Sequence, residues 1–138
     1  MLFRSTKRNR VMFGDHGCAY VYLIYGIYCC LNAVTSPAGI GEGVLIRAVE
    51  PIDGIDLMTA NRHVKKRTDL CNGPGKLCKA FDISISHNGL SLGSSCLRIL
   101  DDGYYNSEIV SAPRVGISQA VDAKLRFYEK NNHYVSVK

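Results

Sequence analysis

Residues 19–32 read AYVYLIYGIYCCLN, an uncharged stretch with four tyrosines, and this stretch decides the fold. Tyr, Val and Ile favour extended backbone, and the alternation puts Tyr20 and Tyr22 on one face of a strand and Val21 and Leu23 on the other. Gly26 lies between the two aromatic-rich halves and can adopt a positive φ without steric cost. The stretch therefore predicts a β-hairpin that reverses at Gly26.

The predicted turn places two bulky side chains, Tyr25 and Ile27, at the exposed tip of the hairpin. A nucleic-acid duplex is one partner that accepts such a wedge, because an inserted apolar side chain unstacks a base step and holds the gap open. The alternative is that the tyrosines line a core. Composition alone leaves both interpretations open.

On the carboxyl side of the hairpin, a turn-rich connection containing Pro37 and three glycines leads into a predicted third strand, VLIRAVEP at 44–51. Arg47 interrupts this apolar strand. A charged side chain there either faces solvent, as is usual on a half-buried strand, or is paired inside and functional.

Two helices are predicted next. The first lies within residues 53–67, with Asp53 as a possible cap, Asp56 in the first turn and basic residues toward its end. The second begins at Pro74 and carries Leu77, Cys78 and Phe81 inward. Segments 95–100, 107–117 and 125–137 are predicted as further strands or strand-bearing loops.

Length and composition limit the classes of protein. The 138 residues predict one domain, and 17 Lys and Arg against 12 Asp and Glu give a net charge of +5, which suits a polyanionic partner but is also common on ordinary solvated surfaces. The six cysteines include no Cys-x-x-Cys pair, and adjacent Cys29 and Cys30 would point to opposite faces of a strand. We therefore expect no metal site, and reduced thiols that act as small buried hydrophobes in an intracellular protein.

A membrane-associated hairpin is a further alternative, because residues 18–40 carry no charge. The dense apolar part is shorter than a bilayer requires, and Gly26, Asn32, Ser36 and Pro37 interrupt the remainder. We expect no membrane-spanning segment.

Several blocks carry a resemblance to a known family. YVYLIYGIYCCLN followed by VLIRAVEP is similar to the alkyladenine (3-methyladenine) DNA glycosylase family. Further blocks occur in the family's order: RNRVMF at 8–13, LCNGPGKLCKA at 70–80, RVGI at 114–117, KLRFY at 124–128 and YVSV at 134–137. The resemblance spans nearly the whole chain, and it is the ordered set of blocks that makes it specific.

The resemblance implies a single α+β domain over residues 1–138, with a curved, mostly antiparallel sheet, surrounding helices and a protruding DNA-intercalating β-hairpin. It implies a monofunctional base-excision glycosylase that flips alkylated or deaminated purines out of double-stranded DNA and hydrolyses their N-glycosidic bond. The damaged base activates its own departure, so no cofactor is expected. A monomer is expected, in the cytoplasm of a bacterium or the nucleus of a eukaryote.

Site residues carried over from the family fall into two groups. In the base pocket, Tyr22 matches an aromatic wall that stacks on the flipped base, and Asn32 matches an amide that discriminates damaged from normal purines. Arg47 and the backbone carbonyl of Val115 match groups that hold the attacking water. The matched DNA-facing residues are the wedge Tyr25, its neighbours Ile27 and Tyr28, and the amino-terminal residues Arg8, Arg10 and Met12.

Three family features have no match in this sequence. Ahead of the RNR block the family carries a catalytic glutamate, a second stacking tyrosine and a pocket histidine, and in register these positions fall before Met1. The glutamate is the general base that activates water. We expect this chain to be silenced or greatly slowed without it, because a general base contributes on the order of a hundredfold to ten-thousandfold in rate. His16, Glu42 and Glu50 are not expected to substitute. A catalytically inactive, DNA-binding remnant of the family is therefore the alternative.

Overall fold

The computed structural model describes residues 4–136 and has the predicted α+β composition. Strands β1 (Ala19–Ile24) and β2 (Tyr28–Val34) form the antiparallel hairpin, and β3 (Gly43–Leu45) pairs with the other edge of β2. Strands β4 (Ile109–Ala112) and β5 (Arg126–Glu129) form a separate two-stranded antiparallel sheet. The antiparallel strands expected in one curved sheet are thus divided between two.

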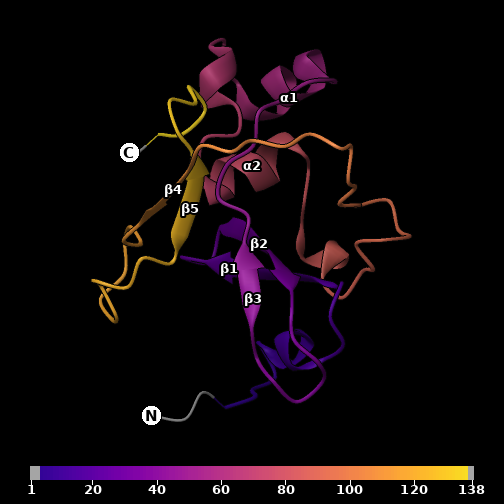
Figure 1. Cartoon of the computed structure of the whole chain (residues 1–138). Coiled ribbons are helices and arrows are strands. Elements are labelled where there is room, and N and C mark those ends of the chain that lie inside the picture. The colour runs from indigo at the N-terminus through magenta and orange to yellow at the C-terminus, as the bar shows by residue number, and fades with distance from the viewer. Residues whose placement is uncertain (1–3, 137–138) are drawn as a thin grey trace.

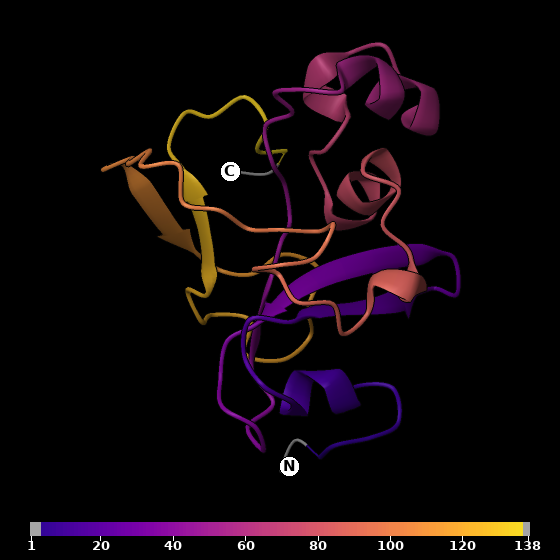
Figure 2. The same cartoon turned by 90° about the vertical axis from the view of Figure 1, so that its right-hand side faces the viewer.

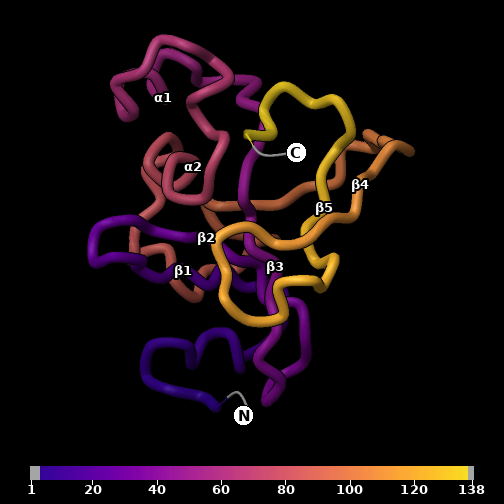
Figure 3. Tube along the Cα trace, turned by 90° about the vertical axis from the view of Figure 1, so that its left-hand side faces the viewer, coloured from indigo at the N-terminus to yellow at the C-terminus, as the bar shows by residue number. Residues whose placement is uncertain are grey.

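The helices lie in layers on the hairpin. Helix α2 (Pro74–Ala80) covers it, and α1 (Ile55–Arg62) lies beyond α2, as Figure 1 and Figure 2 show from two sides. Three short 3₁₀ helices complete the described elements: η1 (Arg10–Phe13), η2 (Arg67–Asp69) and η3 (Ile85–His87). The hairpin protrudes sideways between α2 and the amino-terminal segment (Figure 3).

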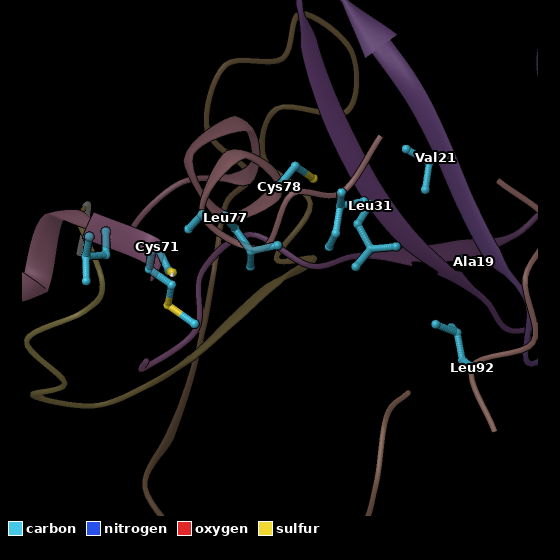
Figure 4. Packing of buried hydrophobic residues seen from close by; sticks show 11 residues of the cluster. Ala19, Val21, Leu31, Cys71, Leu77, Cys78 and Leu92 are labelled. Atoms are coloured by element: carbon cyan, nitrogen blue, oxygen red, sulfur yellow. Dashed lines mark hydrogen bonds between the residues drawn. The ribbon is translucent and has the colours of Figure 1, made fainter. Parts of the chain in front are cut away.

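One face of the hairpin forms the core with α2. Val21 and Leu31 are buried in one cluster with Leu77 and Cys78 of α2 (Figure 4). Met58 of α1 and Leu70 belong to the same cluster. The strand residues of this cluster alternate along β1 and β2, as the period of two requires. The opposite face of the hairpin, here called the tyrosine face, carries Tyr20, Tyr22, Cys30 and Asn32. These four residues do not belong to the cluster that packs on α2.

Local sequence signals for the helices agree with the structure at several positions. Pro74 is the first residue of α2, where its missing N–H costs no hydrogen bond, and Leu77 and Cys78 are buried as predicted. Asp56 lies in the first turn of α1. Asp53 is not the cap, because the chain enters α1 through Gly54 in the left-handed conformation and no side chain caps the helix.

Other predictions were wrong. Phe81 is exposed, because α2 ends at Ala80 before the helical face turns inward again. The strand expected over 44–51 ends at Leu45, since the chain then leaves the sheet and the Val49 N–H donates to the Cys71 carbonyl. No strand forms over 95–100, where the Ile99 N–H folds back to the Leu92 carbonyl.

The cysteines follow the prediction in part. All six are free thiols, and Cys30, Cys71 and Cys78 are buried, whereas Cys96 is exposed on a loop. Residues 4–136 contain no helix with the length and apolar character needed to cross a bilayer. The last residue of the YVSV block, Val137, lies outside the described residues.

Candidate nucleic-acid interface

The hairpin tip is a tight turn with two residues in the left-handed region. Tyr25 has φ 53° and Gly26 has φ 72°, and the Ile27 N–H donates to the Ile24 carbonyl at 3.3 Å. Positive φ values suit the right-handed twist of the flanking strands. Glycine adopts them freely, whereas a tyrosine in this region is strained. The turn thus holds an aromatic side chain at the tip at some cost in conformational energy.

The side chains at this tip face solvent. Tyr25 is 85% exposed, Ile27 70% and Tyr28 49%. The hairpin behind them is fixed, because Val21 and Leu31 are packed in the core. Tyr28 lies against α2 at Gly75, where an added Cβ would come within 3.3 Å of the Cβ of Tyr28. A rigid base with apolar side chains at its end is the geometry that a wedge requires.

The face of the hairpin opposite the core gathers an aromatic and polar cluster, in which Tyr20, Cys30 and Asn32 are buried and Tyr22 is half-buried. The rings of Tyr20 and Tyr22 stack with centroids 5.3 Å apart and planes at 25°. The strand register places Tyr20 opposite Asn32 and Tyr22 opposite Cys30. The Asn32 amide nitrogen donates to the Tyr20 carbonyl at 3.2 Å, and this amide is almost fully buried. The predicted base-pocket residues Tyr22 and Asn32 therefore lie on one face.

The electrostatics of this cluster follow from burial. Burial raises the pKa of the Tyr22 hydroxyl, and its hydrogen bond with the Cys30 thiol raises that pKa further, while the Arg8 cation opposes both. Burial likewise raises the pKa of Cys30, against the influence of Tyr22 and of Arg47. The raised pKa values keep both groups neutral near pH 7, so neither adds a charge to this face.

Arg47 lies just beyond β3 and is half-buried. Its charge acts on the Cys30 thiol across the same face. Val115, whose carbonyl was predicted to share the water site with Arg47, lies on a loop between β4 and β5 and is partly exposed. Within residues 4–136 no hydrogen bond joins Arg47 to Val115. The structure brings Arg47 to the tyrosine face and does not pair it with Val115.

The amino-terminal residues adjoin the hairpin in different ways. Both arginines are exposed, and the Arg8 guanidinium contacts β1, whereas Arg10 lies in η1. Met12 is half-buried and lines an open hollow of about 630 Å³ together with Thr35, Gly41, Glu42, Gly43 and Leu125. Neither Tyr22 nor Asn32 lines this hollow. It is therefore distinct from the predicted base pocket.

The acids near Arg47 in sequence are otherwise engaged or exposed. The Ser36 hydroxyl donates to the Glu42 carboxylate, and Glu50 faces solvent. Neither forms an ion pair with Arg47 in the described part of the chain. Within residues 4–136, no three His, Cys, Asp or Glu side chains are grouped so that they could hold a metal ion.

Sequence reasoning missed two members of the tyrosine face, Tyr20 and Cys30. A usable signal was present, because Tyr22 and Cys30 are equidistant from Gly26 and a hairpin centred there places them opposite each other. The contact between Arg8 and β1 had no such signal, since it joins residues 15 positions apart through a loop.

Comparisons with known proteins place this geometry in context. A family model described as methylpurine-DNA glycosylase (MPG) matches residues 2–133. A protein of Francisella tularensis subsp. tularensis is 47% identical over 137 residues, which covers 96% of this chain and 71% of the relative. A protein of Methanoculleus marisnigri is 48% identical over 136 residues, with the same coverage, and one of Alkaliphilus oremlandii is 46% identical over 146 residues, covering 98% and 72%. All three relatives carry the name "Putative 3-methyladenine DNA glycosylase".

Proposed function

The chain belongs to the methylpurine-DNA glycosylase family, a family of DNA repair, and on that premise we propose that it recognises damaged purines in duplex DNA by flipping them. The proposed reaction is hydrolysis of the N-glycosidic bond of an alkylated or deaminated purine. The target bond is inaccessible in a stacked duplex, so the nucleotide must be turned out and the gap filled. The observation that carries the proposal is the rigid hairpin with Tyr25 and Ile27 exposed at its tip.

In this mechanism the hairpin performs two tasks. Tyr25 enters the stack as the wedge, and Ile27 and Tyr28 contact the DNA beside it. The extruded base stacks on Tyr22, since an electron-rich ring attracts the cationic or electron-poor rings of alkylated purines. The stacked pair of Tyr20 and Tyr22 supports this role by giving the wall a second aromatic layer.

Polar groups complete the proposed pocket. Within residues 4–136 the Asn32 amide oxygen accepts no hydrogen bond, which supports its role as the group that contacts purine substituents. Arg47 and the Val115 carbonyl hold the attacking water in the proposal. Arg10 and Met12 contact the DNA backbone near the wedge. Alkylation makes the base a good leaving group, so the proposed step uses no metal or organic cofactor.

The partner in this proposal is double-stranded DNA that contains a damaged purine, bound by one copy of the chain. The net charge of +5 favours association with a polyanion. We place the protein with its substrate, in the cytoplasm of a bacterial source or the nucleus of a eukaryotic one.

A second candidate function is recognition of the lesion without cleavage of the bond. It is favoured by the positions of Glu42 and Glu50, since one carboxylate is bound by Ser36, the other faces solvent and neither pairs with Arg47. A general base must reach the water within hydrogen-bonding distance. On this reading the hairpin wedges the duplex and the bond stays intact.

The test is single-turnover release of hypoxanthine and 3-methyladenine from duplex DNA by this chain. Tyr25→Asn is the informative variant, because asparagine tolerates the left-handed turn and removes only the wedge. Tyr105→Asn is the matched control, since Tyr105 is 86% exposed and lies outside the hairpin.

Three outcomes separate the candidates. Release that Tyr25→Asn abolishes and Tyr105→Asn preserves supports the glycosylase. Lesion-selective duplex binding that Tyr25→Asn weakens, without release, supports recognition alone. Absence of duplex binding by the parent chain would overturn both.

A further inference from the structure

The outer edge of β1 is covered by the chain itself. The Ala19 N–H donates to the Leu90 carbonyl at 2.8 Å, and the Gly89 N–H donates back to the Ala19 carbonyl at 2.7 Å. The Val21 N–H donates to the Asn88 side-chain oxygen at 3.0 Å. The next residue whose backbone groups face this edge is Leu23.

Arg8 covers the outer edge of β1 at Leu23. Its Nη2 donates to the Leu23 carbonyl at 2.6 Å, and its guanidinium carbon lies 5.3 Å from the centroid of the Tyr22 ring. One planar cation thus binds the backbone of β1 and the aromatic side chain next to it. Tyr22 stacks on Tyr20 as well, so the Tyr22 ring is held by two neighbours.

We propose that Arg8 is a positioning residue that fixes the Tyr22 ring for stacking on the flipped base, and that its role is not a phosphate contact. The inference deepens the proposed function and rests on it, because it assigns the support of the base-stacking wall. The chemistry favours arginine, whose flat guanidinium can stack on a ring while its N–H groups bind a carbonyl in the same plane. A lysine ammonium is a point charge and cannot do both.

Two variants distinguish a role of Arg8 in positioning the Tyr22 ring from a role of its positive charge. Arg8→Gln removes the cation and the stacked plane, and Arg8→Lys keeps the charge and a donor but loses the plane. Lys7→Gln is the matched control, since Lys7 is an exposed cation of the same segment. The primary measurement is the ratio of affinities for a duplex with one hypoxanthine and the same undamaged duplex, at several salt concentrations.

We expect Arg8→Gln and Arg8→Lys each to lower this ratio about tenfold, because a Tyr22 ring that is out of position stacks less well on the flipped base. Lys7→Gln should leave the ratio unchanged. Arg8→Gln and Lys7→Gln should change the salt dependence of binding to undamaged duplex by the same small amount. Melting temperatures of the Arg8 variants close to that of the parent would show that the loss of selectivity is not unfolding.

Two results would overturn the inference. A phosphate contact predicts that Arg8→Gln lowers the slope of log affinity against log salt by about one and keeps the affinity ratio. If the Arg8 guanidinium instead blocks the Tyr22 ring against the flipped base, Arg8→Gln should raise the ratio of affinities for damaged and undamaged duplex.

A double-mutant cycle keeps this inference separate from the proposed function. Arg8→Gln and Tyr22→Leu should show a coupling of about two- to fivefold in the unfolding equilibrium constant, the range for an exposed cation–aromatic pair. Independent effects would refute the contact whatever the protein does. Coupling in a chain that shows no preference for the damaged duplex would instead refute the proposed function and leave Arg8 as a brace of Tyr22 alone.

Discussion

At the scale of single residues, the thiol of Cys78 makes stability depend on pH. Burial in the core, followed by the neighbouring thiols Cys30 and Cys29, raises the pKa of Cys78 from 9.0 to about 12. The native state therefore holds this proton more tightly than the unfolded chain. Its contribution to stability is fully present below pH 9 and is lost as pH rises from 9 toward 12.

We predict that the free energy of unfolding falls by about 1.4 kcal/mol per pH unit over this window because of Cys78. Urea unfolding between pH 7 and pH 11 measures the slope. Cys78→Ala is the control, since burial also raises the pKa values of Cys30, Cys71, Tyr20 and Tyr22, and these groups contribute over the same alkaline range. Equal slopes for the parent and Cys78→Ala would contradict the prediction.

At the scale of elements, η1 is docked on the glycine loop that follows β2. The Gly39 N–H donates to the Phe13 carbonyl at 2.8 Å, and the Phe13 ring lies over Gly41. A Cβ at position 41 would meet the ring at 2.5 Å. No side chain fits there without displacing Phe13.

Gly41→Ala should therefore destabilise the protein by about 1–3 kcal/mol, the usual cost of overpacking. Thermal unfolding checks this beside Gly93→Ala, where a Cβ would have only an ordinary contact at 3.9 Å with the Ser91 hydroxyl. The loss should shrink in a Phe13→Ala background, in which the ring is absent. If the Gly41→Ala and Gly93→Ala variants have the same melting temperature, the contact between Phe13 and Gly41 does not hold η1 in place.

The elements that sequence predicts well are those that local chemistry determines. Alternating residues around Gly26 define the hairpin, and Pro74 defines the start of α2. The strand expected over 44–51 stops early because of a long-range bond, from Val49 to Cys71, which no local pattern contains. The same difference between local patterns and long-range contacts applies to the residues of the site. Exposure of Tyr25 and Ile27 follows from the turn, whereas the contact of Arg8 with Leu23 depends on tertiary structure.

At the scale of the whole molecule, stability should be unevenly distributed. The hairpin belongs to a three-stranded sheet packed on α2. The β4–β5 ribbon has two strands only, and Ile109 and Phe127 on one face are exposed. A two-stranded ribbon is marginal by itself, so its hydrogen bonds should open locally without global unfolding.

Hydrogen exchange read by mass spectrometry measures this difference. We predict that amides of β4 and β5 exchange about a hundredfold faster than those of the β1–β2 pairs near Val21 and Leu31, which should open only with the whole domain. The two regions serve as each other's reference in one experiment. Equal protection would mean that the ribbon and the hairpin unfold as one unit.

The covered edge of β1 also has a consequence for self-association. AYVYLI combines aromatic and β-branched residues without charge, the composition of segments that build fibrils by adding strands from other chains. A second molecule would need the outer backbone groups of this strand, and Asn88, Gly89, Leu90 and Arg8 already occupy them. Polymerisation along β1 therefore has to wait for the protein to release its own segment first, which makes intact tertiary structure the safeguard against amyloid growth.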